Sequence, residues 1–535
     1  MSRSPLIPLF ARLVQQARTS RLTGIPLPEV VEQHAERART RRRFLQGMVA
    51  AGALLAVPKL AHAEDLADFF TFKRTSQPTI AIIGGGMAGL HCAWRLNRKG
   101  LRATVYEAAT RTGGRMLSDR TTFSGSGQTC ELGGEFIDTG HKMMRKLAHH
   151  FDLILEDKEQ DLPGLTDVAG YFNGRTVPYA ELLTLFAPIA AKIDASLATL
   201  TVPVKGISYA NPNGGEALDA MSLTQWLNHN NVHGIGRELV TVAHEIEWGL
   251  DANEMNAYDM LGLISTNTKK IELFGDSDER FHIAGGNDQI PTRLAAELSG
   301  QIETGQVLER ISQRADGRFV LQFAGRSTTV VADHIVSAIP FNILRTIDLD
   351  LPLPALKRTA INELGYGQNT KCMTGYASRP WRTQGSNGES FSDLAYQNTW
   401  DTAQMQAGAH GILTEYTGGS RALTAGTGTT AAHASNFVSQ INHVYPGTAA
   451  AYSGEAIRLA WNTMPFNQAS YSAYLVGQYT KFAGTEGDRV GNFHFAGEHT
   501  DFDYQGYMEG AARSGARVAK EILTDEGLSD LSAAG

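Results

Sequence analysis

The stretch TIAIIGGGMAGL, from Thr79 to Leu90, is the most informative part of this 535-residue chain. Its apolar run ends in Gly84, Gly86 and Gly89. Glycines at this spacing permit a tight turn, close approach of the backbone to a pyrophosphate, and close packing of the next helix. We expect that helix to begin near Met87, where free N–H groups and the helix dipole attract anionic phosphates.

The residues that follow complete the pattern. A second strand is predicted at 103–106, and Glu107 comes directly after it, twenty-three residues beyond Gly84. This is near the spacing expected for a carboxylate that binds ribose hydroxyls. The run Gly113-Gly114-Arg115 lies a few residues further on. Strand, turn, helix, strand and acidic residue in this order predict a dinucleotide-binding Rossmann fold.

The first 63 residues are interpreted as a leader that is removed from the mature protein. Residues 40–46 read TRRRFLQ, which resembles a twin-arginine export motif. Residues 47–60 are moderately apolar and precede the small-residue pattern Ala61-His62-Ala63. Because a bilayer span needs about twenty residues, this apolar stretch is too short to be an anchor. We expect cleavage after Ala63 and a periplasmic or secreted protein.

Charge and cysteine content exclude several classes of partner. Without residues 1–63, 38 Lys and Arg face 52 Asp and Glu, a formal net charge of −14 against −7 for the whole chain. We therefore expect no nucleic acid and no anionic membrane surface as a partner. No later apolar run predicts a membrane span, so we expect no stable membrane insertion, and a homodimer is possible. Three scattered cysteines (Cys92, Cys130 and Cys372) predict neither a disulfide framework nor a metal site.

The middle of the chain predicts helices first and strands later. Residues 147–264 read as mostly helical, with Ser222 as the N-cap of one amphipathic run. Residues 319–323 and 328–331 read as the two strands of a hairpin, and residues 334–338 as a strand that returns to the main sheet.

A second glycine-bearing motif lies near the end of the sequence. FHFAGEHT, residues 493–500, predicts a short strand that ends in the carboxylate of Glu498. GYMEGAARSG, residues 506–515, then opens a helix whose N-terminus could stabilise negative charge on the same ligand. In combination with the first motif, this pattern resembles the flavin-containing amine oxidase family, which includes monoamine oxidases, polyamine oxidases and L-amino acid oxidases.

The resemblance extends from about Thr79 to Ile522. Other motifs follow in the family's order: ELGGE at 131–135, AGGNDQIP at 284–291, Val307, AIP at 338–340 and WNTMPFNQASY at 461–471. It implies a two-domain α/β fold in which a monoamine-oxidase-type substrate domain is inserted into a glutathione-reductase-like FAD domain. The FAD domain would comprise residues 64–150, 276–345 and 466–535, and the substrate domain residues 151–275, mostly helical, and 346–465.

The resemblance implies FAD as the cofactor. It places Glu107 on the adenosine ribose, Arg115 near the pyrophosphate and flavin, Val307 on the adenine, Glu498 on the pyrophosphate side and Met508 at the flavin ring. Because Ser470 stands where monoamine oxidases carry the cysteine that bonds to the flavin, FAD should be bound non-covalently. The other predicted cofactor residues are Gly84, Gly86, Met87, Ala88, Gly89, Ala108, Gly114, Gly134, Glu135, Gly506 and Tyr507.

Two tyrosines are the sharpest functional prediction. Tyr471 and Tyr507 match the positions that form an aromatic sandwich before the flavin in monoamine oxidases. Parallel aromatic faces would orient an amine and favour its approach electrostatically. The alternative is that both tyrosines serve ordinary packing.

Other active-site features of the family are absent at their expected positions. The usual lysine that holds a water beside flavin N5 is replaced by Thr346, whose hydroxyl is a candidate for that task. Lys371 in a neighbouring strand is the nearest alternative, although a surface or ion-pair role is commoner for lysine. Glu135-Phe136 stands where snake-venom-type L-amino acid oxidases carry an arginine, and an acidic group there favours a cationic substrate.

We therefore predict an FAD-dependent amine oxidase. Hydride transfer from the amine-bearing carbon to flavin N5 would give an imine, which hydrolyses to an aldehyde or ketone with ammonia or a smaller amine. O2, with release of H2O2, or a periplasmic electron carrier would reoxidise the flavin. Three alternatives stay open: an L-amino acid oxidase that yields a 2-oxo acid, a flavin-dependent desaturase or porphyrinogen oxidase, and a flavin-binding protein without turnover.

Overall fold

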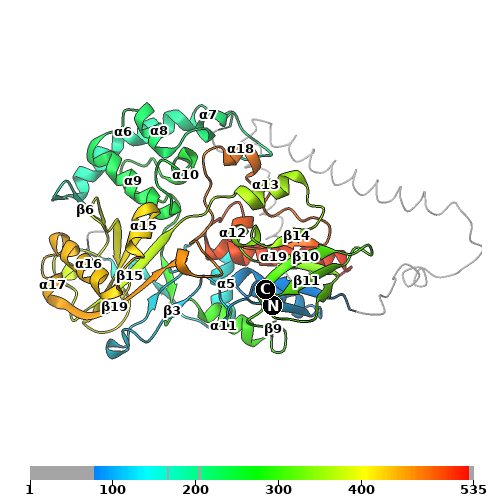
Figure 1. The fold of residues 1–535 in the computed structure, drawn as a ribbon. Coiled ribbons are helices and arrows are strands. Elements are labelled where there is room, and N and C mark those ends of the chain that lie inside the picture. Colours follow the sequence, from blue (N-terminus) through cyan, green and yellow to red (C-terminus); the bar gives the residue numbers. More distant parts are fainter. Residues whose placement is uncertain (1–76, 166–167, 203–205, 529–535) are drawn as a thin grey trace, which may run out of the picture. The chain divides into compact units, whose positions relative to one another are not determined.

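The computed structural model describes residues 77–165, 168–202 and 206–528 (Figure 1). The predicted leader, residues 1–63, lies outside the described residues. Among the helices that are described, none is long and apolar enough to cross a bilayer. The three cysteines are buried and have free thiols.

A five-stranded parallel sheet forms the predicted dinucleotide fold, with the strand order β20-β13-β1-β2-β9. β1 (Ile80–Ile83) is buried at every position, as expected for a central parallel strand covered on both faces. The predicted strands at 103–106, 334–338 and 493 onward are confirmed. They are β2 (Ala103–Tyr106), β13 (His334–Ser337) and β20 (Phe493–Phe495), and the edge strand is β9 (Ile302–Glu303).

Two helices from opposite ends of the chain pack against each other beside this sheet. α4 (Met87–Asn97) begins at the predicted residue, and α19 (Met508–Asp525) follows the second glycine motif. Their close approach depends on Gly515, because a Cβ there would lie 2.4 Å from the carbonyl oxygen of Ala88. The small residues of the second motif therefore have the packing role that the sequence predicted.

A mixed seven-stranded sheet has the order β19-β15-β18-β17-β16-β6-β7. Helices α6, α8, α9 and α10 form a group beside it (Figure 1). The bounds of these elements are β6 (Ala169–Phe172), β7 (Arg175–Val177), β15 (Asn369–Tyr376), β16 (Ser390–Ser392), β17 (Asn398–Asp401), β18 (Gly411–Gly418), β19 (Tyr452–Ala460), α6 (Tyr179–Leu197), α8 (Leu223–His229), α9 (Gly234–Trp248) and α10 (Ala257–Leu263).

The prediction of a mostly helical segment at 147–264 holds with one correction. Ser222 caps α8 as predicted, and its hydroxyl accepts from the backbone N–H of Gln225 in a capping box. The segment also contains β5 (Leu155–Asp157) and the β6–β7 hairpin. That hairpin turns at Asn173-Gly174, where both residues have positive φ. An Asn-Gly pair is a strong hairpin signal, so its local chemistry outweighs the surrounding helical pattern.

The predicted later hairpin is confirmed as β11 (Phe319–Phe323) and β12 (Val330–Ala332), which pair antiparallel. β10 (Leu308–Gln313) and β14 (Asp348–Asp350) complete this four-stranded sheet. The α/β fold class is thus confirmed, and the exact domain boundaries stay a prediction. The other strands are β3 (Ser118–Asp119), β4 (Cys130–Glu131) and β8 (Phe281–Ile283); the longer remaining helices are α5 (Lys142–His150), α11 (Gln289–Ala296), α13 (Ala355–Glu363) and α16 (Thr430–Val444).

Candidate active site

A cavity of about 1010 Å³ opens at the edge of the parallel sheet where the strands end. Ligands of open α/β sheets bind in the crevice outside the carboxyl ends of the strands. Gly84, Glu107, Ala338 and Glu498 follow the ends of β1, β2, β13 and β20, and all four line the cavity. The N-termini of α4 and α19 also reach it through Met87 and Met508, so two positive helix ends face one space.

The three glycines of the first motif have separate structural tasks. Gly84 has a φ of 104°, which side chains rarely adopt, so it makes the turn. A Cβ on Gly86 would meet only the Cα of Gly114, at 3.8 Å, because it would point into the cavity. Gly89 is absent from the cavity lining; a Cβ there would lie 2.0 Å from the carbonyl oxygen of Gly84. Gly89 therefore permits helix packing and does not contact a ligand directly.

Glu107 is held at the end of β2 by backbone donors. Its Oε2 accepts from the N–H of Gly85 at 2.6 Å, and its Oε1 accepts from the N–H of Ala109 at 2.7 Å. A carboxylate oxygen can accept more than one hydrogen bond, so lone pairs remain for two ribose hydroxyls. The predicted role of Glu107 fits this geometry.

Arg115 and Glu498 form an ion pair of 2.9 Å between the two glycine motifs. Glu498 also accepts from the hydroxyl of Ser472 at 2.7 Å and from the N–H of Gly506 at 2.8 Å. Burial raises the pKa of Glu498, but Arg115 and these donors outweigh it and hold the pKa below its usual range. Glu498 therefore acts by holding Arg115 and the turn before α19.

Gly134 lies against the side chain of Met508, since a Cβ on Gly134 would be 2.8 Å from the Met508 sulfur. Val307 lies immediately before β10 and lines the same cavity. The remaining predicted cofactor residues also line it: Ala88, Ala108, Gly114, Glu135, Gly506 and Tyr507. The structure thus brings together every predicted cofactor residue except Gly89.

Both predicted tyrosines face the cavity and are held by the last turn of α9. Tyr471 donates to the carbonyl oxygen of Ile246 at 3.0 Å, and Tyr507 donates to the carboxylate of Glu247 at 3.0 Å. Tyr471 also shares a hydrogen bond of 3.0 Å with Tyr416. The orientation of the two rings is therefore fixed by a helix whose negative dipole end points at the cavity.

An aromatic wall continues from the tyrosines toward Glu135. Tyr416 packs edge-on against Trp400, with ring centroids 5.4 Å apart, and Trp400 packs edge-on against Phe136 at 5.5 Å. All three residues line the cavity. The three neighbouring rings make this part of the cavity wall apolar.

Lys371 and Glu135 form a buried ion pair of 2.8 Å. Lys371 is only 6% exposed, so the surface alternative is wrong and the ion-pair alternative is confirmed. Its Nζ also donates to the carbonyl oxygens of Glu131 and Gly133, so all three ammonium protons have acceptors. Lys371 is therefore a positioning residue for the Gly133–Glu135 turn.

The pairing also corrects the prediction that Glu135 favours a cationic substrate, because Lys371 already supplies its cation. Glu135 accepts further hydrogen bonds from Trp400 at 2.9 Å and Thr402 at 3.1 Å. Burial would raise the pKa of Glu135, but Lys371 and these donors hold it below its usual range. Glu135 serves to anchor the aromatic wall.

Thr346 lies away from this network. It is exposed at the cavity rim, beyond the short helix α12 (Phe341–Leu344), and its hydroxyl donates to the carbonyl oxygen of Ile343 at 2.8 Å. Its proton is thus committed to its own turn. Of the two candidates for the position of the family's lysine, Lys371 is buried beside the aromatic wall and Thr346 is not. The prediction that preferred Thr346 is thereby corrected.

Ser470 is buried, and its hydroxyl donates to the side chain of Asn369 at 2.6 Å. A hydroxyl cannot form the thioether found in monoamine oxidases. We expect acid precipitation of the yellow protein to release all FAD into the supernatant, measured by absorbance. Flavin retained in the washed pellet would contradict non-covalent binding.

Several carboxyl groups line the cavity, and one of them, that of Glu247, accepts a hydrogen bond from Tyr507. Burial raises the pKa of Glu247 to about 7, although the hydrogen bond from Tyr507 opposes this. Burial also raises the pKa of Glu279 to about 8; Lys158 opposes the rise, and Glu389 and Glu247 add to it. Glu247, Glu279 and Glu389 all line the cavity. A cation that entered beside Glu247 and Glu279 would favour their ionised forms.

Four further residues of the cavity wall were not predicted from the sequence: Glu247, Glu279, Tyr416 and Trp400. No local motif marks them, because each becomes important only through a contact with a distant residue. Glu247 lies in the last turn of α9, where an acidic residue opposes the helix dipole, but the sequence predicted no end of a helix at this point. An unfavourable placement of this kind indicates a function.

The donors and the space fit FAD. The open space at Gly86, the carboxylate of Glu107 at the end of β2 and the two helix N-termini match a long anionic dinucleotide, and the aromatic wall lines the same cavity. Fold and cavity together define a flavoprotein oxidoreductase of the dinucleotide-binding type.

The chain belongs to the flavin-containing amine oxidoreductase family, whose model matches residues 87–523. Relatives include a putative flavin-containing monoamine oxidase, AofH, of Mycobacterium tuberculosis, 23% identical over 83% of this chain and 96% of its own. The putative L-amino-acid oxidase YobN of Bacillus subtilis is 25% identical over 83% of this chain and 94% of its own. The family prediction is confirmed, and with it the flavin cofactor and the oxidoreductase activity.

Solved structures share the fold at low identity. Cyclohexylamine oxidase from Brevibacterium oxydans matches with a TM-score of 0.73 and 21% identity, over 84% of this chain and all of its own. Putrescine oxidase bound to putrescine matches with a TM-score of 0.71 and 18% identity, over 84% of this chain and 99% of its own. At this identity the likeness concerns the fold.

Proposed function

We propose that this amine oxidase acts on primary amines that carry a second cationic group, such as α,ω-diamines. The observation that carries the proposal is the carboxyl pair Glu247 and Glu279 on the cavity wall that also holds Tyr507. When bound, FAD supplies the two-electron oxidation by accepting a hydride from the amine-bearing carbon. Water then hydrolyses the imine product to a carbonyl compound and ammonia.

The residues of this chain would position the amine. Tyr471 and Tyr507 are held by α9 and flank the approach to the cofactor, and the wall of Phe136, Trp400 and Tyr416 excludes water. A second ammonium group would lie near Glu247 and Glu279. Both carboxyl groups have a raised pKa, so a bound cation favours their ionised form and each gains an ion pair.

An L-amino acid substrate is the second candidate, supported by the relative YobN. It needs a cation for its carboxylate. The arginines among the described cavity residues are already paired: Arg111 with backbone carbonyls, Arg115 with Glu498, and Arg280 with Asp157. Lys158, whose Nζ lies 3.7 Å from the centre of the Phe136 ring, is the cavity cation that would serve.

The test is anaerobic flavin bleaching by matched compounds: an α,ω-diamine, the n-alkylamine of equal chain length, and neutral and basic L-amino acids. We expect the diamine to reduce the flavin with a specificity constant about 10-fold or more above that of the monoamine, because it gains an ion pair. Glu279→Gln should remove most of this preference and leave the monoamine rate unchanged. Glu272→Gln, at the cavity wall and paired with Lys270, is the matched control.

The outcomes separate the candidates. Equal specificity constants for diamine and monoamine would overturn the diamine assignment, and the protein would still be an oxidase of amines. Bleaching by L-amino acids alone would establish the second candidate, and Lys158→Met should then abolish it. A flavin that no compound bleaches would indicate a binding protein without turnover.

We also propose that the protein works outside the cytoplasm and passes its electrons to O2, with release of H2O2, or to a periplasmic electron carrier. The twin-arginine pattern at residues 40–46 and the small-residue pattern at 61–63 support this location.

A further inference from the structure

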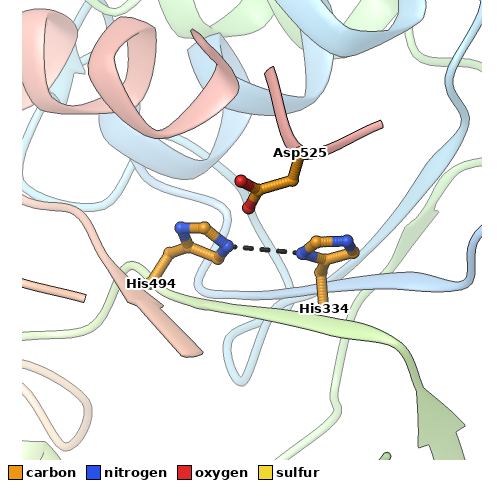
Figure 2. Close-up of side chains that lie close together, drawn as sticks. All are labelled: His334, His494 and Asp525. Atoms are coloured by element: carbon orange, nitrogen blue, oxygen red, sulfur yellow. Dashed lines mark hydrogen bonds between the residues drawn. The ribbon is translucent and has the colours of Figure 1, made fainter. Parts of the chain in front are cut away.

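A histidine pair lies on the parallel sheet, away from the cavity edge. His334 is the first residue of β13, and His494 is on the adjacent strand β20 (Figure 2). The register pairs Val336 with His494, so His334 and His494 are diagonal neighbours on the same face of the sheet. Asp525, the last residue of α19, completes the group. α19 begins at the cavity, so this group lies at its opposite end.

Each imidazole has one nitrogen committed to a carboxylate. Nδ1 of His494 lies 2.8 Å from Oε2 of Glu521, and Nε2 of His334 lies 3.0 Å from Oε1 of Glu526. Ionised carboxylates only accept hydrogen bonds, so both of these nitrogens carry a proton. A neutral imidazole has one protonated nitrogen and one nitrogen with a free lone pair. In the neutral rings the lone pairs are therefore on Nε2 of His494 and Nδ1 of His334.

The two lone pairs face each other across 3.4 Å (Figure 2). As a hydrogen bond this contact would be long and would need a second proton on one buried ring. Two imidazole nitrogens bound to one tetrahedral zinc ion, each at about 2.05 Å, are separated by about 3.3 Å. The observed separation therefore matches a shared metal ion.

Asp525 brings a carboxylate to the same group. His334, His494 and Asp525 each offer one possible ligand atom, and these three atoms lie within 4.8 Å of one another. Asp525 is exposed, which gives an ion a route from solvent, and its ion pair with Arg489 orients the carboxylate. The negative end of the α19 dipole also favours a cation here.

We propose that His334, His494 and Asp525 bind a divalent transition-metal ion, with Zn²⁺ preferred, and that the ion joins β13, β20 and the end of α19. Two imidazoles and one carboxylate favour Zn²⁺ over Mg²⁺ or Ca²⁺, with water in the fourth position. Glu521 and Glu526 orient the two rings through their outer nitrogens, as carboxylates commonly do behind metal-bound histidines. The role is structural, because the group lies away from the cofactor cavity.

A second cluster of Cys372, Glu415 and His433 provides a contrast. There Nε2 of His433 lies 2.6 Å from the Glu415 carboxylate, so the possible ligands already satisfy each other. Burial raises the pKa of the Cys372 thiol, which opposes the thiolate that a metal needs. His433 therefore serves as the matched control histidine.

The test uses the FAD-loaded protein, purified without a polyhistidine tag, dialysed against a chelator and then incubated with Zn²⁺. We expect about one equivalent of Zn²⁺ to remain bound after gel filtration, measured by elemental analysis, and Mg²⁺ not to compete. Zinc at about 100 times its Kd should raise the unfolding midpoint by about 2 °C or more. His334→Gln and His494→Gln should lose this binding, Glu521→Gln should weaken it about 10-fold, and His433→Gln should leave it unchanged.

Flavin content reports whether each variant folds. Asp525→Asn changes only an exposed side chain and should weaken zinc binding without any change in flavin content. Failure of the wild-type protein to retain zinc would overturn the proposal. The contact between His334 and His494 would then be a hydrogen bond in which the two nitrogens share a proton. Equal retention by the wild type, His334→Gln and His494→Gln would overturn it as well.

Discussion

Replacement of Lys371 by Met is expected to destabilise the protein by about 3–5 kcal/mol, because it leaves the Glu135 carboxylate buried without its cation. The two side chains are 7% and 4% exposed, so water cannot compensate. The Gly133–Glu135 turn would also lose the ammonium that binds two of its carbonyl groups. Denaturant unfolding followed by tryptophan fluorescence measures the loss, and flavin content should fall with it because Gly134 packs on Met508.

The double variant Glu135→Gln with Lys371→Met is the control. Removal of both charges should recover at least half of the lost free energy, because a neutral pair of similar volume carries little desolvation cost. The wild-type pair also predicts a pH dependence. The pKa of Glu135 is lowered in the folded state, so its stabilisation is present above the ordinary carboxyl pKa and is lost as the pH falls. Unfolding free energies that are equal for the wild type and Lys371→Met would contradict a buried ion pair.

The two ends of the sequence were predictable because their signals are local. The apolar run before Gly84 and the small residues after Gly506 belong to two segments of about thirty residues. The pattern of each segment predicts a strand, a turn and a helix. β1 with α4, and β20 with α19, appear where these patterns predict them. The β6–β7 hairpin was missed although Asn173-Gly174 is also a local signal, because the surrounding apolar spacing suited a helix.

The substrate side was less predictable because its contacts join distant residues. Lys371 and Glu135 were each noted, but they are 236 positions apart, and nothing in either segment indicates that they pair. Tyr507 and Glu247 are 260 positions apart. Pairings of this kind depend on how the seven-stranded sheet and α9 approach the cavity, which local patterns do not determine.

Gly86→Ala and Gly89→Ala are expected to fail in different ways, although the two residues are three positions apart. A methyl group at Gly86 meets only the Cα of Gly114, at 3.8 Å, and occupies cavity space. Its backbone φ of −78° suits any residue. We expect Gly86→Ala to fold with an unchanged unfolding midpoint in the absence of cofactor, and to bind FAD about 10–100-fold more weakly, because the methyl group holds the pyrophosphate away.

Gly89→Ala places its methyl group 2.0 Å from the carbonyl oxygen of Gly84, a backbone atom that cannot move without displacing α4. We expect a loss of about 3 kcal/mol or more in unfolding free energy, together with loss of FAD. Gly125→Ala, at an exposed site with only the Glu455 carboxylate 3.9 Å away, is the neutral control. Cofactor titration and thermal unfolding of the three variants separate the two effects. If Gly86→Ala bound FAD as tightly as the wild type, the pyrophosphate would have to lie elsewhere in the cavity.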